Sequence, residues 1–230
     1  MIDNKRVLAL IPARGGSKGI KDKNIVEVMG RPLINYTIEA AKGSKYIDRI
    51  VVSTDSIIIK NISEESGADV PFLRPEYLAS DTATTLEAVL HAIYILEEMG
   101  DSYDILVLLQ TTSPLRTTKD IDGAIETFIE NECNSVVAVS PVNDSPILIR
   151  TIDQNGKLKK LLKCGSTIRR QDMPTYYRVN GSIYVNLVQN INKYTSFNDN
   201  GVPYFMDKER SLDIDEPIDL ELFKYYLNNE

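Results

Sequence analysis

The stretch that most constrains the fold of this chain is residues 7–24, VLALIPARGGSKGIKDKN. Its first five residues are apolar, which is typical of a strand buried within a sheet. Pro12 should end this strand, because proline has no N–H to donate to a neighbouring strand. The loop that follows holds three glycines and four cationic residues. Glycines let backbone N–H groups approach a ligand, so the loop predicts a phosphate site, with an ordinary basic surface turn as the alternative.

Two named phosphate-binding motifs are absent from this loop. The pattern GxxxxGK[ST] does not occur, which excludes a Walker A loop. The pattern GxGxxG is also missing, which excludes the usual dinucleotide fingerprint. A phosphate site here must therefore be of another kind.

Size and charge limit the class of protein. The chain has 230 residues, 43% of them hydrophobic, which suits one folded domain with a substantial core. The formal net charge is −7, so nucleic acid is not an expected partner. An acidic protein that binds an anionic substrate must gather its cations locally, and residues 14–23 do this.

Cysteine and histidine usage limits the chemistry. Cys133 and Cys164 are far apart and form no CxxC pair, which favours free thiols in a reducing compartment. No apolar stretch approaches the ~20 residues that span a bilayer, and no signal peptide is recognisable, so we expect a cytoplasmic protein without a membrane segment. His91 is the only histidine, and we expect it to pack within a helix. Any metal would then have oxygen ligands, which favours magnesium.

Strands and helices alternate along most of the chain. This order predicts an α/β fold with a doubly wound, mostly parallel sheet, in which ligands bind beyond the carboxyl ends of the strands. A polar stretch at about 143–175 interrupts the order and predicts a small β-rich arm inserted into a single domain, 1–230. Besides residues 7–11, we expect strands at 49–54, 70–72, 104–109, 135–139, 176–179 and 182–187, and helices at 33–41, 56–66, 84–99, 119–131, 188–197 and 217–227. The strand at 104–109 should be central and parallel. Asp55, which follows the strand at 49–54, should cap the helix at 56–66.

Two carboxylates near the C-terminus are candidates for a metal site. Asp213 and Asp215 flank Ile214 in SLDIDEP, and on a strand such residues point to the same face. Two neighbouring carboxylates repel unless a cation lies between them, so they predict a divalent ion that also contacts a phosphate. The alternative is an acidic cluster that only stabilises the start of the final helix.

Several segments resemble one known family. The loop IPARGGSKGIKDKN is similar to the signature loop of the CMP-sialic acid synthetases, also called acylneuraminate cytidylyltransferases. LLQTTSPLR resembles a second family segment, with Thr111 in place of proline. FLRPEYLASDT and RRQDMPTYYRVNGSIYV resemble two more, and Val179 again replaces a proline. The likeness extends from Leu8 to Asp215 and implies a Rossmann-like nucleotidyltransferase fold.

The resemblance implies roles for particular residues. Catalysis is implied for Arg14, Lys23, Asp213 and Asp215, of which the two aspartates would hold Mg²⁺. The implied nucleotide-binding residues are Arg14, Gly15, Gly16, Ser17, Lys23, Asn24, Arg74, Ala83 and Thr85, with Asn24 at the base edge. The implied sugar-binding residues are Gln110, Arg170, Arg178, Tyr184 and Phe197. Two departures lie on the sugar side: no lysine occurs in 143–149, and Phe197-Asn198 stands where some members have two phenylalanines.

The activity implied by the resemblance is transfer of CMP from CTP to a nine-carbon 2-keto sugar acid, releasing pyrophosphate. Alternatives are a cytidylyltransferase for another sugar acid such as Kdo, and a non-catalytic nucleotide-binding protein. Two aspartates argue against the second, because binding CTP alone needs no paired metal site. Family likeness also implies a homodimer formed through the arm, with Arg170 near the interface. The arm residues expected to be exposed for this purpose are Ile147, Leu148, Leu161 and Leu162.

Overall fold

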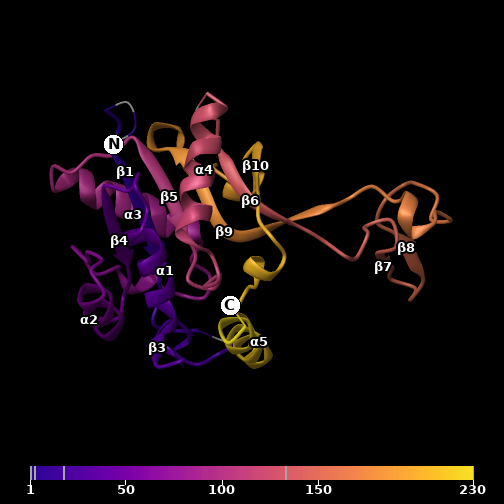
Figure 1. The fold of residues 1–230 in the computed structure, drawn as a ribbon, viewed down its shortest axis with the longest axis horizontal. Coiled ribbons are helices and arrows are strands. Elements are labelled where there is room, and N and C mark those ends of the chain that lie inside the picture. Colours follow the sequence, from indigo (N-terminus) through magenta and orange to yellow (C-terminus); the bar gives the residue numbers. More distant parts are fainter. Residues whose placement is uncertain (1, 3, 18, 133, 230) are drawn as a thin grey trace.

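A six-stranded mixed sheet forms the centre of the protein, which is described here from a computed structural model covering residues 2, 4–17, 19–132 and 134–229 (Figure 1). Its strand order is β10-β6-β9-β5-β1-β4. β1 pairs in parallel with β4 and β5, and β10 with β6, whereas β9 runs antiparallel between β5 and β6. The strands are β1 (Val7–Pro12), β4 (Arg49–Ser53), β5 (Ile105–Leu109), β6 (Val136–Pro141), β9 (Tyr177–Leu187) and β10 (Val202–Phe205). The mostly parallel α/β sheet is confirmed.

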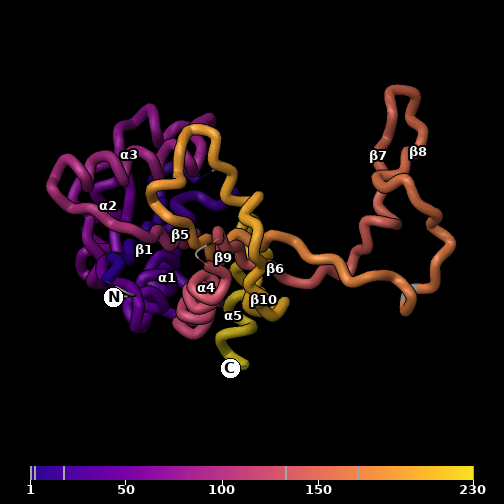
Figure 2. The backbone as a smooth tube through the Cα atoms, turned by 90° about the horizontal axis from the view of Figure 1, so that it is seen from above, coloured from indigo at the N-terminus to yellow at the C-terminus, as the bar shows by residue number. Residues whose placement is uncertain are grey.

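Helices cover both faces of this sheet. They are α1 (Leu33–Lys42), α2 (Ile57–Glu65), α3 (Thr85–Glu98) and α4 (Thr118–Glu130), whereas α5 (Pro217–Leu227) packs in a separate apolar cluster with Leu33. Successive residues of β1 point to opposite faces, so Ala9 packs with Ile38 of α1 and Ile125 of α4. Leu10 packs instead with Val89 of α3. Figure 2 shows α1 and α4 on one side of the sheet and α3 on the other.

Helix starts are set by local capping. The Thr84 side chain accepts a hydrogen bond from the backbone N–H of Glu87, and Glu87 accepts one in return, which starts α3 at the expected place. α2 is capped by Ser56, whose side chain accepts from the N–H of Ile59. The prediction that Asp55 caps α2 is therefore wrong. His91 packs edge-to-face on Phe72 with ring centroids 5.3 Å apart, in keeping with its expected packing role.

Three expected elements differ from the structure. Residues 70–72 form no strand, because Pro71 cannot donate to a ladder and only isolated bridges remain on either side. Residues 188–197 form no α-helix. Asn192 there bonds to the local backbone and competes with helix formation. The two strands expected at 176–179 and 182–187 are one strand, β9, which begins at Tyr177 and pairs antiparallel with β5. β10 was not predicted.

The polar stretch forms an arm that projects from the ends of β6 and β9 (Figures 1 and 2). A small hairpin lies in the arm, made of β7 (Arg150–Ile152) and β8 (Leu158–Lys160). Leu148, Leu161 and Leu162 are exposed as expected, but Ile147 is buried. A second two-stranded ribbon, β2 (Glu27–Val28) and β3 (Arg31–Pro32), precedes α1. No helix among the described residues combines the length and apolarity needed to cross a bilayer.

Candidate active site

A cavity of about 430 Å³ opens at the carboxyl ends of β1 and β5. From these neighbouring strands the chain continues toward opposite edges of the sheet, because β1 is followed in the sheet by β4 on one side and β5 by β6 on the other. Open α/β sheets bind ligands at such a point. Nine of the predicted residues line the cavity: Arg14, Ser17, Lys23, Asn24, Arg74, Ala83, Thr85, Gln110 and Asp215.

The glycine-rich loop after β1 is fastened at both ends. The N–H of Gly15 donates to Asp55 Oδ1 at 2.9 Å, so Asp55 holds the loop instead of capping a helix. The Arg14 guanidinium donates to the carbonyl of Ser80 at 2.9 Å and pairs with Asp81. Gly19 packs so closely that a Cβ there would lie 2.4 Å from the carbonyl oxygen of Asp215. Only glycine permits this contact between the loop and the C-terminal segment.

Asn24 joins the two loops that flank the cavity. Its Nδ2 donates to the carbonyl of Arg14 at 2.8 Å, and its Oδ1 accepts from Thr111 Oγ1 at 2.5 Å. Asn24 is also buried. Thr111 is one of the residues that depart from the family pattern, and only its hydroxyl makes this link possible. To contact the base edge as predicted, Asn24 would have to use the hydrogen-bonding positions of its amide that these two bonds leave open.

Lys23 connects the loop to the C-terminal carboxylates. Its Nζ donates to the carbonyl of Ile214 at 2.6 Å and to Asp215 Oδ1 at 2.9 Å. The segment around Ile214 is irregular, so the predicted strand with both aspartates on one face is wrong. Ile214 is buried, and its N–H donates to the carbonyl of Thr112, which fixes the segment beside the loop after β5. Asp215 lines the large cavity, and Asp213 lines a second one.

The second cavity has a volume of about 300 Å³ and is lined partly by Arg178, Tyr184 and Asp213. The Tyr184 hydroxyl donates to Asn198 Oδ1 at 2.8 Å. Burial, with the charge of Asp213 adding to it, raises the pKa of Tyr184 to about 12, so the hydroxyl stays protonated. Phe197 packs against the Tyr184 ring and does not line the cavity.

The two cavities adjoin at Gln110. Gln110 lines the larger cavity and Gly181 lines the smaller one. A Cβ on Gly181 would lie 3.1 Å from Gln110 Oε1, so the amide passes directly over this glycine. The two neighbouring cavities are together called the groove, and the contact between Gln110 and Gly181 marks the junction of its two compartments.

Two predicted arginines differ from the rest. Arg74 is buried, and its guanidinium donates to the side chain and carbonyl of Ser53 and to the carbonyl of Leu78. Burial, opposed by nearby Asp55, lowers its pKa. The backbone of Arg170 begins the short 3-10 helix η3 (Arg170–Asp172) in the arm, and its side chain lies outside the described part of the structure. Gly15 and Gly16 belong to the loop but do not line either cavity.

The carboxylates suit a hard divalent cation. The described residues contain no group of three or more His, Cys, Asp or Glu side chains that could enclose a metal. Mg²⁺ needs no such cage, because one or two carboxylates together with substrate phosphates often hold it. Desolvation raises the pKa of Asp213, and the charge of Asp215 adds to this effect. A bound cation would offset the cost of keeping Asp213 ionised beside Asp215. The two aspartates therefore fit a nucleotide-bound magnesium ion.

Solved structures share this architecture. CMP:2-keto-3-deoxy-manno-octonic acid synthetase complexed with CTP aligns with a TM-score of 0.73 at 14% identity, covering 97% of this chain and 99% of that one. A 4-diphosphocytidyl-2C-methyl-D-erythritol synthase from Anaerococcus prevotii aligns with a TM-score of 0.67 at 16% identity, covering 98% and 100%. At such identities the likeness shows the fold, which is that of nucleotidyltransferases.

Sequence comparison identifies the family. The cytidylyltransferase family model matches residues 8–230, so the chain belongs to the cytidylyltransferase family and is a nucleotidyltransferase enzyme. It is 39% identical to the CMP-N,N'-diacetyllegionaminic acid synthase of Legionella pneumophila, covering 94% of both chains. It is 32% identical to a pseudaminic acid cytidylyltransferase of Campylobacter jejuni, covering 97% of both. It is 37% identical to an Escherichia coli N-acylneuraminate cytidylyltransferase over 94% of this chain but only 51% of the relative.

Proposed function

We propose that this protein transfers the cytidylyl group of CTP to a nonulosonic, sialic-type acid and releases pyrophosphate. The observation that carries the proposal is the two-compartment groove. Its larger part is lined by the glycine-rich basic loop, which suits the phosphates of CTP. Its smaller part presents Arg178 and the protonated Tyr184, which suit a carboxylate and hydroxyl groups. The related synthases named above act on legionaminic, pseudaminic and N-acylneuraminic acids.

The reaction in this groove requires positioning and charge neutralisation more than covalent chemistry. The anomeric hydroxyl of the sugar acid attacks the α-phosphorus of CTP, the bond to the β-phosphate breaks, and pyrophosphate leaves. Arg14 and Lys23 lie on the wall of the larger cavity and would stabilise the triphosphate and the departing pyrophosphate. Asp213 and Asp215 would hold Mg²⁺, which neutralises phosphate charge when bound.

The Kdo alternative has weaker support. It rests on a structural likeness at 14% identity, whereas the nonulosonic relatives reach 39%. Among the nonulosonic acids, the departures at residues 143–149 and at Asn198 both affect the sugar side. The outer substituents of the acid are therefore the part of the substrate to be determined by experiment.

A substrate panel tests the function. Purified protein is incubated with CTP, magnesium and, separately, N-acetylneuraminic, legionaminic, pseudaminic and Kdo acids. We expect pyrophosphate release and a product with the mass of the CMP-sugar for at least one nonulosonic acid. A product only with Kdo would move the substrate to the eight-carbon class. Tight CTP binding without pyrophosphate from any acid would favour the non-catalytic alternative.

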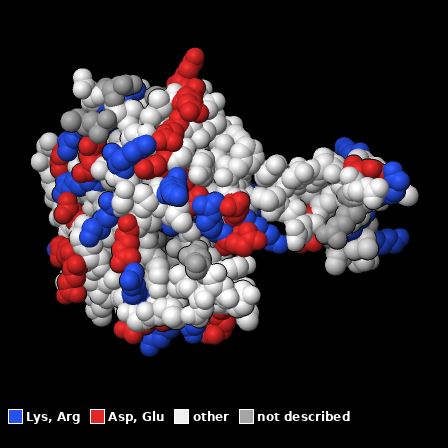
Figure 3. Space-filling model, in the orientation of Figure 1, with Lys and Arg blue, Asp and Glu red and all other residues white. Residues whose placement is uncertain are grey.

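We also propose that the arm pairs two copies of the chain into a homodimer. Ile152 and Leu158 face each other across the β7–β8 hairpin and are 72% and 73% exposed. Residues 150–172 contain seven Lys or Arg and two Asp, although the whole chain is acidic. Figure 3 shows some of these cations gathered on the arm. An arm that is apolar and basic is complementary to the acidic body of a second copy.

Leu158→Glu should convert the dimer to a monomer, because it places a charge in an apolar contact. Light scattering at micromolar concentration measures the mass. Asn155→Glu is the matched control, since it adds the same charge at the exposed hairpin turn without removing apolar surface, and it should stay dimeric. A monomeric parent protein would contradict the proposal.

A further inference from the structure

Arg116 is a buried cation that the proposed reaction does not use. Its exposed fraction is 2%. Burial lowers its pKa to about 9, with nearby Asp120 opposing the shift, so the guanidinium is still charged at neutral pH. Among the described residues, the guanidinium of Arg116 donates hydrogen bonds only to neutral oxygens, which belong to Gln110, Ser182 and Thr37. Burying a charge in this way is costly, so a specific structural purpose is expected.

One of the oxygens that Arg116 reaches lies where the pairing of two strands is broken. The pairing of β6 with β9 jumps from Val137↔Tyr184 to Val139↔Val179, so residues 180–183 bulge on the side of β6, while Ile183 stays paired with Leu109 of β5. Gly181 lies in this bulge at a φ of +74°, a conformation that favours glycine. A bulge disrupts the ladder locally. Arg116 Nε donates to the carbonyl of Ser182, which lies in this bulge, at 3.1 Å.

A second nitrogen of the same guanidinium donates to the carbonyl of Gln110, at the end of β5. A third donates to Thr37 Oγ1 on α1 at 3.3 Å, which anchors the fork to the helix layer. The planar guanidinium therefore ties the end of β5 to the bulge of β9. These are the two backbone segments that carry the Gln110 side chain and Gly181, where the two compartments of the groove meet.

We propose that Arg116 is a positioning residue that sets the junction between the two compartments and so determines how the sugar acid is held. This inference rests on the proposed function, in which Gln110 faces the sugar. Arg116 acts through backbone carbonyls and lines neither compartment. Its effect should appear mainly in the handling of the acid, because Arg116 bonds to the backbone of Gln110 and Ser182. The phosphate loop after β1 is held at Asp55 and Ser80, and at the side chain of Thr111 through Asn24.

Arg116→Lys keeps the charge but loses the planar fork that serves two carbonyls at once. We expect the KM for the acid to rise about tenfold or more, while the KM for CTP changes less than twofold. In a Gln110→Ala background the same substitution should cost less than twofold in the KM for the acid, because the side chain that Arg116 positions is then absent. Equal effects in both backgrounds, or equal effects on the two KM values, would overturn the proposal.

Loss of stability alone must be separated from loss of positioning. Phe128→Leu serves as the control, because Phe128 is fully buried in the core at the end of α4, away from both compartments. It should lower the melting temperature without changing the ratio of the two KM values. If Arg116→Lys does not fold, Thr37→Val, which removes only the bond at 3.3 Å, should raise the KM for the acid two- to threefold. An unchanged KM in that variant would also overturn the inference.

A readout without turnover distinguishes failure of this inference from failure of the proposed function. Amide hydrogen exchange should rise in Arg116→Lys over residues 109–116 and 179–184, and Phe128→Leu should leave these segments unchanged. If the parent enzyme is inactive on every acid, the proposed function fails while this local exchange pattern still tests the positioning role. Exchange that is unchanged in both segments would refute that role.

Discussion

Replacing either Asp213 or Asp215 with Asn should lower turnover by a factor on the order of 10²–10⁴, because each removes a charge that would hold magnesium against the phosphates. Asn keeps the size of the side chain, so the irregular segment around buried Ile214 should remain in place. Pyrophosphate release, measured over a range of magnesium concentrations, gives the effect. Partial recovery at high magnesium would support a ligand role directly.

Stability should respond differently in the two variants. The folded protein raises the pKa of Asp213, so ionising this carboxylate disfavours the fold. The stability gained from its protonated form is present at low pH and is lost as the pH rises through the raised pKa. Asp213→Asn should therefore raise the melting temperature at neutral pH without magnesium. Asp215→Asn weakens an ion pair to Lys23 at a 70% exposed carboxylate, which should cost less than about 1 kcal/mol.

The alternative for these aspartates was a purely structural role at the start of the final helix. The structure gives the capping role to Glu216 and Asp219, which form a capping box, and Asp219 Oδ2 also accepts from the N–H of Asp215. The carboxylates of Asp213 and Asp215 are therefore not needed as caps. Full turnover in both Asn variants would nevertheless remove the metal assignment, and with it the main argument for catalysis that comes from this segment.

The sequence predicted the parts of the fold that depend on local pattern. The apolar run before Pro12 and the capped amphipathic helix α3 are defined by neighbouring residues, and both lie where expected. The sequence did not predict β9 as one antiparallel strand between β5 and β6, because that pairing joins residues far apart in the chain. β10 was missed because Pro203 argues against a strand, although proline is tolerated at a sheet edge.

In the site, too, the features set by local pattern could be predicted and those set by distant residues could not. The loop at residues 14–24 was found because glycines and cations concentrate there. Thr111 and Arg116 were missed, since neither differs in type from residues of an ordinary loop. Thr111 is important because the fold places Asn24 beside its hydroxyl. Arg116 is important because the fold places the carbonyls of Gln110 and Ser182 beside its guanidinium. One signal was available, because Thr111 is a departure from the resembling segment and so marks a changed contact.

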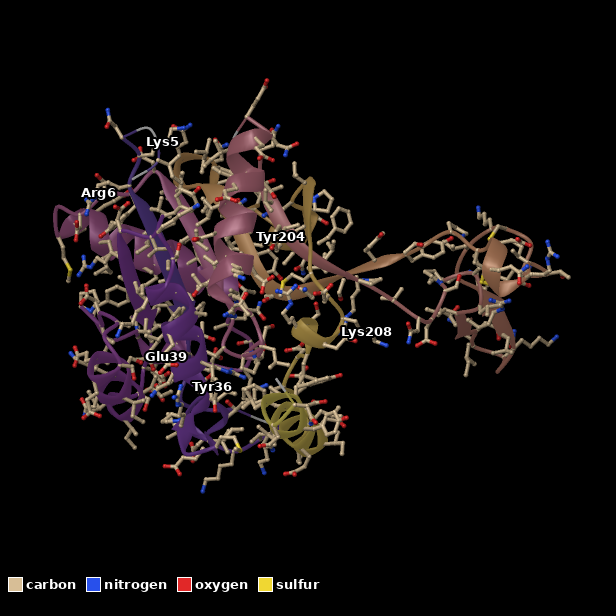
Figure 4. All side chains as sticks on the ribbon, in the orientation of Figure 1. Lys5, Arg6, Tyr36, Glu39, Tyr204 and Lys208 are labelled. Atoms are coloured by element: carbon tan, nitrogen blue, oxygen red, sulfur yellow. The ribbon has the colours of Figure 1, made fainter. Side chains whose placement is uncertain are left out.

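Buried polar contacts between residues far apart in the chain are not visible in the sequence elsewhere in the protein either. Asp120 shows this away from the site. It is 1% exposed and starts α4, yet it also pairs with Arg210 at 2.9 Å and lies near the hydroxyl of Tyr204. Figure 4 shows Tyr204 beside α4. The helical pattern of residues 119–131 predicts a helix but not this tertiary ion pair, which depends on the position of the C-terminal segment.

Lys23→Met should lower kcat/KM for CTP by about 10²–10³, the cost of removing one preorganised charge from a developing anion. Lys23 is 13% exposed, and two of its ammonium donors are held by Ile214 O and Asp215 Oδ1. This arrangement leaves a third donor for a phosphate oxygen in the cavity that Lys23 lines. Met keeps the apolar stem, so the loop should remain packed.

Lys21→Met is the matched control for Lys23→Met. Lys21 lies on the same loop and carries the same charge, but it is exposed and does not line the cavity. Its loss should change kcat/KM less than threefold, and added salt should shrink this small effect, because exposed charges act through a screened field. The effect of Lys23→Met should persist at high salt, since its ammonium is held in place beside the phosphates. Equal losses in the two variants would mean that the loop attracts CTP by its overall charge, and the contact role of Lys23 would then be wrong.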